Sequence, residues 1–333
     1  MTKLILLFCS AMLLSCSQKG SGETNLPTSD IKETKVQTET PTFHADSAYS
    51  YIEKQVAFGY RIPNTPAHKA CGNFLVSELK RFGAQIFEQE TTLTAYNGTP
   101  LEIRNIIGSF NPDQKKRILL FAHWDSRPYS DHDPDPSNHK KPLDGADDGA
   151  SGVGVLLEIA RQISIKSPNI GIDIIFFDAE DYGTPEFAKD QYNASNDTWC
   201  LGSRFWGKNP HIPNYKAECG ILLDMVGAKE AVFYKEHISM RYAARYVEEV
   251  WNKARNLGYG KYFINANGGG VIDDHEAVIE GTGIPCLDII NFDPYTSKGF
   301  GEHWHTQKDN MENIDKEVLK AVGQTVLEVI YTR

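Results

Sequence analysis

The sequence has few cysteines and few positive charges, and each shortage excludes a class of protein. Six cysteines occur in 333 residues, and no two of them are spaced as a CxxC pair. A zinc knuckle or a dithiol redox site is therefore not expected. Lys and Arg total 34 against 44 Asp and Glu, the net charge is −10, and the longest basic run is Lys115-Lys116-Arg117. This shortage of positive charge excludes a nucleic-acid-binding protein, because such binding depends mainly on Lys and Arg that neutralise phosphates.

The apolar stretch at the N-terminus is too short to span a membrane. It runs from Leu4 to Leu14, follows Lys3, and ends at Ser15-Cys16, whereas a membrane-spanning helix needs about 20 apolar residues. The pattern is typical of a bacterial lipoprotein signal over residues 1–16, in which Cys16 is lipidated and becomes the mature N-terminus; an ordinary secretory signal cut nearby is the alternative. Both indicate export. We expect a lipid-anchored, periplasmic protein that contacts the membrane only through its anchor.

Large apolar side chains are almost absent from residues 17–42, which are rich in Ser, Thr, Lys, Glu and Gln. Such a segment cannot bury enough surface to offset chain entropy, so we interpret it as a flexible tether. Residues 43–333 then form the folded domain, and the composition, 41% hydrophobic, allows one large core. Four cysteines remain in this domain, and the sequence does not assign their pairing: Cys71, Cys200, Cys219 and Cys286.

The pattern of apolar residues predicts a single α/β domain with a mostly parallel central sheet flanked by helices. Short, nearly continuous apolar runs indicate strands that are buried on both faces, and they cover residues 117–122, 172–177, 220–223 and 284–290. Alternating stretches over 85–96 and 101–110, joined through Asn97-Gly98, predict a hairpin. Helices are expected over residues 46–57, 64–82, 153–163, 239–257 and 315–331, the last with Asp315 as its cap.

Histidine and acidic residues follow three of the predicted strands. His123 and Asp125 come after the first apolar run, Glu180 and Asp181 after the second, and Asp224 after the third. In open α/β sheets the carboxyl ends of parallel strands meet at the edge where ligands bind. A lone Asp after a strand is usually a turn residue or a helix cap, but five such residues after three strands are not easily explained in that way. The pattern indicates a catalytic metal site assembled at this edge.

Three further segments carry candidate donors, and two of them have a structural alternative. Asp147-Asp148 lies in a glycine-rich turn before the helix over 153–163, where Asp148 could simply be the N-cap. Asp273-Asp274-His275 follows three glycines and could be a solvated loop. His305 lies between Trp304 and Thr306. A loop histidine is usually exposed, but here it completes a set of two carboxylates and one imidazole.

Together these segments resemble the animal-type (type II) glutaminyl-peptide cyclotransferases, whose fold is shared with zinc aminopeptidases. The similarity covers the chain from about Ala48 to the C-terminus and includes, in order, HWDS, GADDGASG, FFDAED, LLDMVGA, DDHEAV and HWHT. The resemblance implies a single zinc ion held by Asp148, Asp181 and His305, with Glu180 as general acid/base. It further implies that Asp224 and Asp273 hydrogen-bond the reacting groups, and that Trp304 and Phe300 are aromatic walls of the pocket.

The implied reaction is the cyclisation of N-terminal glutamine, and more slowly glutamate, to pyroglutamate, with release of ammonia in the glutamine case. The partners would be peptides and exported proteins that begin with Gln; the oligomeric state is not predicted. The chain departs from the family in two places. Asp181 stands where the animal enzymes have Glu, and the segment after it lacks their pocket Trp. Trp199 or Trp206 could replace that Trp, although structural burial is the favoured role for each.

Two other functions were weighed against the cyclase. A two-zinc aminopeptidase of the same fold would use His123 and Asp224 for a second metal bridged by Asp148, whereas His123 binds no metal in the cyclase interpretation. The Trp304-His305 pair, the acidic 273–274 segment and Trp124 favour the cyclase. A surface lipoprotein that only binds would be expected to have lost metal ligands or the acid/base Glu, and none is missing.

Overall fold

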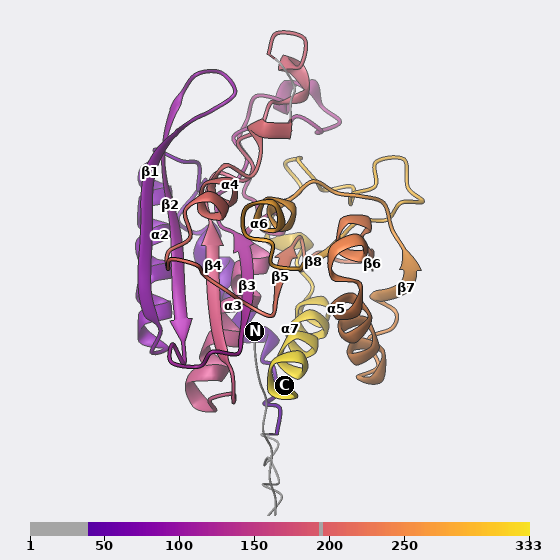
Figure 1. The fold of residues 1–333 in the computed structure, drawn as a ribbon. Coiled ribbons are helices and arrows are strands. Elements are labelled where there is room, and N and C mark those ends of the chain that lie inside the picture. Colours follow the sequence, from indigo (N-terminus) through magenta and orange to yellow (C-terminus); the bar gives the residue numbers. More distant parts are fainter. Residues whose placement is uncertain (1–38, 193–195) are drawn as a thin grey trace, which may run out of the picture. The chain divides into compact units, whose positions relative to one another are not determined.

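A six-stranded sheet with the order β1-β2-β4-β3-β5-β8 forms the centre of the fold (Figure 1). The computed structural model describes residues 39–192 and 196–333, which belong to one compact unit. The predicted signal segment and most of the tether lie outside the described residues. The strands of the main sheet are β1 (Gln85–Thr94), β2 (Pro100–Phe110), β3 (Arg117–His123), β4 (Gly171–Phe177), β5 (Cys219–Asp224) and β8 (Cys286–Ile290).

The sheet is parallel where the site lies and antiparallel at one edge. Strands β4, β3, β5 and β8 are parallel to one another, and the β1–β2 hairpin joins this part through an antiparallel β2–β4 pairing. The hairpin turn contains Gly98 at φ 83°, a left-handed conformation that glycine adopts without a steric penalty. Two short strands, β6 (Phe233–Lys235) and β7 (Phe263–Asn267), form a separate parallel pair. The predicted α/β fold is confirmed.

Helices cover both faces of the sheet, and the side chains of each strand alternate between them. Ile118 and Leu120 of β3 pack in the larger core cluster with α1, α2, α3, α5 and α7, whereas Leu119 and Phe121 pack with α4 and α6. The helices are α1 (Ala45–Val56), α2 (Pro66–Arg81), α3 (Ala150–Ile165), α4 (Leu201–Lys208), α5 (His237–Asn256), α6 (Asp274–Thr282) and α7 (Lys316–Tyr331). None of the helices in the described part of the chain is both long and apolar enough to cross a membrane.

Each predicted strand and helix is present within a few residues of its expected bounds, and Asp315 caps α7 by accepting from the backbone N–H of Glu317 at 2.8 Å. The helices α4 and α6 and the β6–β7 pair were not predicted.

The solvated-loop alternative for 273–275 is wrong, because Asp273 is the buried N-cap of α6. The folded domain also begins slightly before residue 43, since Pro41 O accepts a hydrogen bond from Gln324 Nε2 at 3.1 Å. Cys71, Cys200, Cys219 and Cys286 are all buried free thiols.

Candidate metal centre

The carboxyl ends of β3, β4 and β5 bring the predicted donors to one edge of the sheet. His123 is the last residue of β3, Asp224 is the last residue of β5, and Glu180 and Asp181 follow the end of β4. Because these strands are parallel and adjacent, their ends must meet. The loops before α3 and α7 add Asp148 and His305 to the same place. The result is a group of donors drawn from five separate chain segments, all of them buried except the partly exposed Glu180.

Asp148, Asp181 and His305 form a compact donor set. One ligand atom from each lies within 4.8 Å of the others. His305 Nε2 is 3.3 Å from Asp181 Oδ1 and 3.5 Å from Asp148 Oδ2. All three residues are buried. Two carboxylates and one imidazole are donors that suit a catalytic zinc, which keeps a further position for water or substrate.

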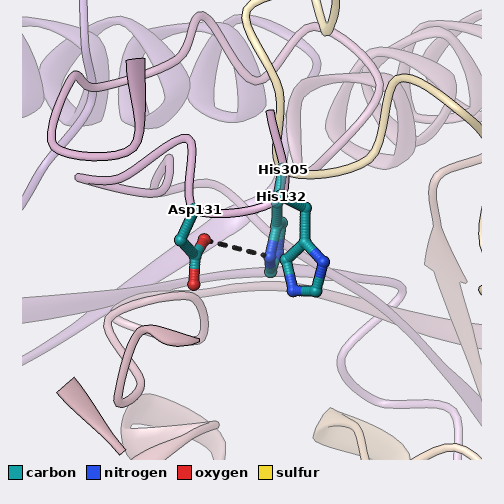
Figure 2. A group of neighbouring side chains, drawn as sticks. All are labelled: Asp131, His132 and His305. Carbon is teal, nitrogen blue, oxygen red and sulfur yellow. Dashed lines mark ion pairs between the residues drawn. The ribbon is translucent and has the colours of Figure 1, made fainter. Parts of the chain in front are cut away.

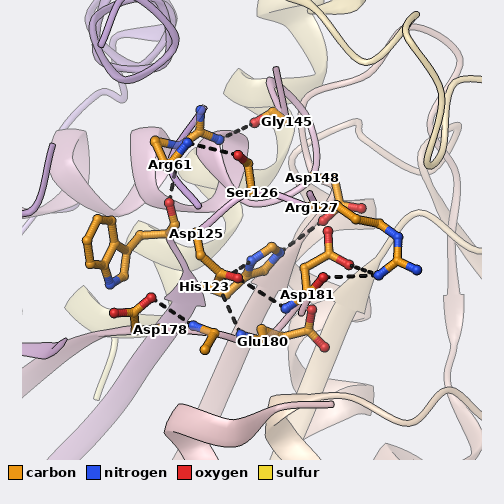
Figure 3. Close-up of polar contacts among 12 residues, drawn as sticks. Arg61, His123, Asp125, Ser126, Arg127, Gly145, Asp148, Asp178, Glu180 and Asp181 are labelled. Carbon is orange, nitrogen blue, oxygen red and sulfur yellow. Dashed lines mark hydrogen bonds and ion pairs between the residues drawn. The ribbon is translucent and has the colours of Figure 1, made fainter. Parts of the chain in front are cut away.

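The turn before α3 directs Asp148 into this set. Gly149, at φ 104°, is the N-cap residue of α3, so the alternative that Asp148 caps the helix is wrong. A Cβ at Gly149 would lie 2.6 Å from His123 Cε1, and only glycine therefore permits the turn to approach His123 so closely. The buried Arg61 also supports the turn. Its guanidinium donates to the carbonyl oxygen of Gly145 at 2.7 Å (Figure 3) and to that of Asp144 at 2.7 Å.

Asp181 is held through both its backbone and its side chain. The carboxylate of Asp125 accepts hydrogen bonds from the backbone N–H groups of Glu180 and Asp181, at 3.1 and 3.2 Å (Figure 3). Arg127 Nη1 donates to Asp181 Oδ1 at 3.2 Å. Burial raises the pKa of Asp181, and the positive charge of Arg127 opposes that rise. The cation keeps the buried carboxylate oriented toward the donor set.

His305 has a left-handed backbone, with φ at 53°, and its ring lies between Asp131 and the donor set. Asp131 Oδ1 lies 3.6 Å from His305 Nδ1, on the side of the ring opposite Nε2 (Figure 2). Asp131 is itself bound by Arg127 through two hydrogen bonds of 2.7 Å. Burial, together with the charge of Arg127, lowers the pKa of His305 well below its ordinary value. The imidazole is therefore neutral and has a lone pair for a metal ion. His132 lies beside this pair, but both oxygens of Asp131 are already occupied by Arg127.

A second donor set shares Asp148. His123 Nε2 is 3.0 Å from Asp148 Oδ1 and 3.3 Å from Asp224 Oδ1, and its Nδ1 is 3.4 Å from Asp125 Oδ1. Burial alone would lower the pKa of His123, but the three surrounding carboxylates raise it well above its ordinary value. This arrangement corresponds to the second metal position of the aminopeptidase alternative, with Asp148 as the bridge.

Several donor atoms of the two sets lack a hydrogen-bond partner within the described residues. They are Asp181 Oδ2, His123 Nε2, Asp224 Oδ1 and His305 Nδ1. Buried polar atoms without partners cost free energy, and a cation bound by the two carboxylate oxygens would remove that cost for them. The first three atoms face the donor sets. The residues present therefore fit a divalent metal ion that accepts nitrogen and oxygen ligands, such as zinc.

A cavity of about 280 Å³ opens over the donor sets, with aromatic walls. Trp304 stacks on His305 with ring centroids 3.8 Å apart, and Phe300 stacks on Trp304 at 4.4 Å. Trp199 also lines the cavity, with its ring parallel to His305 at 6.1 Å. Trp206 is a residue of α4. It is fully buried and packs in the smaller core cluster, together with residues of α6. The expectation of mere structural burial thus holds for Trp206 and is wrong for Trp199.

Trp124 lies outside this cavity. It is fully buried and stacks on His68 at 4.2 Å, and its Nε1 donates to Arg104 O at 3.2 Å. It therefore contributes nothing directly to the pocket, and its place after His123 is no argument for one activity over another.

Two carboxylates complete the floor of the cavity, Glu180 and Asp273. Burial raises the pKa of Glu180 well above its ordinary range, and the negative charges of Asp273 and Asp181 act in the same direction. Burial and the charge of Asp224 likewise raise the pKa of Asp273. Carboxyl groups with raised pKa values in an enclosed pocket can exchange protons near neutral pH, which is what a general acid/base requires.

Two residues that support the donor set, Arg127 and Asp131, were not predicted from the sequence as parts of the site, and Trp199 lines the pocket although structural burial was its favoured role. Arg127 directly follows the HWDS segment, so its place in the sequence could have suggested a role. Asp131 lies in a loop rich in Asp and Pro without any periodic pattern. Its contact with His305 depends on a tertiary approach that no local signal marks.

Comparisons with known proteins agree with this geometry. The glutaminyl-peptide cyclotransferase of Bos taurus is 29% identical over 297 residues, which cover 81% of this chain and 77% of the bovine protein. A zinc-dependent exopeptidase of Parabacteroides distasonis has a similar crystal structure, with a TM-score of 0.87 and 70% identity over 89% of this chain and 100% of that one. The glutaminyl cyclase of Tannerella forsythia gives a TM-score of 0.85 and 67% identity, over 88% and 100%. Residues 105–330 match the sequence profile of peptidase family M28, and the chain belongs to that family.

Proposed function

We propose that this protein is a zinc-dependent glutaminyl-peptide cyclotransferase, which converts N-terminal glutamine, and more slowly glutamate, to pyroglutamate. The observation that carries the proposal is the aromatic-lined cavity, in which Glu180 and Asp273 lie beside the Asp148–Asp181–His305 donor set. The similarity to glutaminyl cyclases of animals and bacteria supports it. A single zinc ion per chain would be held by Asp148, Asp181 and His305. The chemistry that zinc supplies when bound is polarisation of the substrate's side-chain carbonyl.

The reaction needs a proton carrier and no water. The substrate's α-amine attacks its own side-chain carbonyl carbon, so that a carbon–nitrogen bond forms and the amine loses a proton to Glu180. Glu180 then returns a proton to the side-chain nitrogen, the second carbon–nitrogen bond breaks, and ammonia leaves. Asp273 and Asp224 orient the amine and the leaving group. Trp304, Phe300 and Trp199 line the cavity, and with substrate bound these walls would limit the access of water and grip the first residue of the substrate.

A two-zinc aminopeptidase is the second candidate, and one observation favours it. His123, Asp148 and Asp224 also form a buried group whose ligand atoms lie within 4.8 Å of one another. In that case a water activated between two metal ions would release the N-terminal residue of the substrate. The number of metal ions per active chain and the nature of the product separate the two candidates.

The direct test is to incubate the purified protein with a peptide that begins with Gln and to follow the product by mass spectrometry. Loss of ammonia from an otherwise intact peptide, prevented by a zinc chelator and restored by added zinc, is the expected result. Release of free glutamine would assign the aminopeptidase instead. A matched peptide that begins with Asn serves as the control, because its shorter side chain would close a strained four-membered ring.

The N-terminal segment supports a further part of the proposal, the place where the enzyme acts. We infer that Cys16 is lipidated after export, that the anchor holds the domain at a bacterial membrane facing the periplasm, and that its substrates are exported proteins and peptides with N-terminal Gln. Labelled fatty acid should enter the wild-type protein and not a Cys16→Ser variant. Equal labelling of both would contradict the anchor.

A further inference from the structure

Cys200 contacts the carboxylate that the proposed function uses as acid/base. Its Sγ lies 3.2 Å from Glu180 Oε1, within hydrogen-bond range for sulfur. Cys200, Glu180 and Asp273 place one ligand-type atom each within 4.8 Å of one another, so the thiol lies beside both carboxylates on the floor of the cavity. Burial and the adjacent negative charges raise the pKa of the Cys200 thiol well above its ordinary value. It therefore keeps its proton at neutral pH and can act as a donor.

The backbone fixes the thiol in this place. Cys200 has a left-handed conformation, with φ 57° and ψ 36°, which costs free energy for a residue other than glycine. Its backbone N–H donates to Glu180 O at 3.0 Å, and the next amide, of Leu201, donates to Ala179 O at 3.1 Å. A Cβ at Gly202 would lie 2.2 Å from Asp178 O, so the start of α4 is docked tightly against the segment that carries Glu180. The thiol therefore has little freedom to point elsewhere.

We propose that Cys200 is a positioning residue, whose S–H donates to Glu180 Oε1 and so directs the other carboxylate oxygen toward the substrate amine. The role in turnover rests on the proposed function, but the contact itself does not. Without a donor at this place, the Glu180 side chain could rotate about its own torsions and would spend less time in the productive orientation. A hydrogen bond of this kind is worth about 1 kcal/mol, which corresponds to a change in rate of roughly fivefold to tenfold.

Steady-state kinetics of Cys200→Ala and Cys200→Ser test the proposal. We expect Cys200→Ala to lower kcat by roughly tenfold with little change in KM or in zinc content. Cys200→Ser keeps a donor and should recover most of the lost kcat. Cys219→Ala is the matched control, since Cys219 is another fully buried thiol and lies at the opposite end of the sheet strand β5 from the site. It should match Cys200→Ala in thermal stability but retain wild-type kcat.

Two kinetic outcomes would overturn the proposal. The first is wild-type kcat in Cys200→Ala. The second is a Cys200→Ser variant that folds and binds zinc but is as slow as Cys200→Ala, because packing alone would then explain the loss.

Infrared spectroscopy tests the contact without any turnover. The S–H stretching band of Cys200 is identified as the band that Cys200→Ala removes. We expect it to shift in Glu180→Gln, where a neutral acceptor replaces the carboxylate. An unchanged band would mean that no such hydrogen bond exists. If the wild-type protein released no ammonia from a Gln peptide, the proposed function would fail while this measurement would still decide the contact.

Discussion

At the scale of single residues, Asp181 offers the proposed metal site a carboxylate one methylene shorter than the Glu that the family resemblance implies at this position. Asp181 Oδ1 still lies 3.3 Å from His305 Nε2, because Asp125 holds the Asp181 backbone amide at 3.2 Å and so places the main chain close to the other donors. The shorter side chain therefore remains within the donor set.

Glu180→Gln should keep the fold and the bound zinc but lower kcat by about 10²-fold to 10⁴-fold, because the amide cannot carry a proton between the two nitrogens. Metal analysis and ammonia release, measured on the same preparation, check this. Substantial turnover in the variant would show that another group is the acid/base.

Asp181→Ala should lose most of its zinc, because it removes one of three protein ligands. The metal content of the purified variant, determined by elemental analysis, is the measurement. Asp113→Ala, which removes an exposed carboxylate far from the donor set, is the control and should retain zinc. Full occupancy in Asp181→Ala would refute its place as a ligand.

At the scale of elements, the sequence predicted what depends on continuous apolar runs and missed what depends on tertiary contact. The strands that end at His123 and Asp224 could be predicted because parallel strands buried on both faces read as unbroken apolar segments. Helix α6 could not, because it has only nine residues and lies shortly after three glycines, a pattern that also suits a loop. The burial of Asp273 and the contact of Cys200 with Glu180 also could not be predicted, because both depend on tertiary contacts between distant segments.

The close approach of α3 to the sheet predicts that Gly152→Ala is strongly destabilising. A Cβ there would lie 2.1 Å from Leu223 O, on the strand β5 that ends at Asp224. The helix must therefore shift, at a cost of about 1–3 kcal/mol or more in the free energy of unfolding. Thermal or urea denaturation measures this. Gly260→Ala, where a Cβ would meet nothing closer than 3.9 Å, should change stability by no more than about 0.5 kcal/mol.

The N-terminus of α5 predicts a stability that depends on pH. Glu236 caps this helix by accepting from the backbone N–H groups of Ile238 and Ser239, and it also contacts His275 Nε2 at 3.2 Å. Burial alone would raise its pKa, but these hydrogen bonds lower the pKa of Glu236 to about 2. A lowered pKa in the folded state stabilises the protein fully above the ordinary pKa of about 4.3, and this stabilisation is lost as the pH falls toward 2.

Glu236→Gln should therefore reduce the free energy of unfolding by about 2 kcal/mol at pH 7. The difference from the wild type should shrink between about pH 4.5 and pH 2, where the wild-type carboxylate gains a proton. Denaturation curves at several pH values check this. A difference that stays constant with pH would mean that the charge of Glu236 does not contribute.

At the scale of the whole molecule, the sheet brings together donors that are far apart in the chain. Asp148, Asp181 and His305 lie on three different loops, yet each loop leaves or enters the same edge of the sheet (Figure 1). The scaffold is shared by the family M28 peptidases, so the architecture alone does not determine the reaction. We expect the number of metal ions that the active chain needs to distinguish a cyclase from a peptidase.

The most direct test is a titration of zinc into metal-free protein, with a Gln-initiated peptide as substrate and both ammonia and free glutamine measured. A cyclase with one zinc ion per chain should reach its maximal ammonia release at one equivalent of zinc and form no free glutamine. Activity that requires two equivalents and produces free glutamine would contradict the cyclase and would assign the two-zinc aminopeptidase.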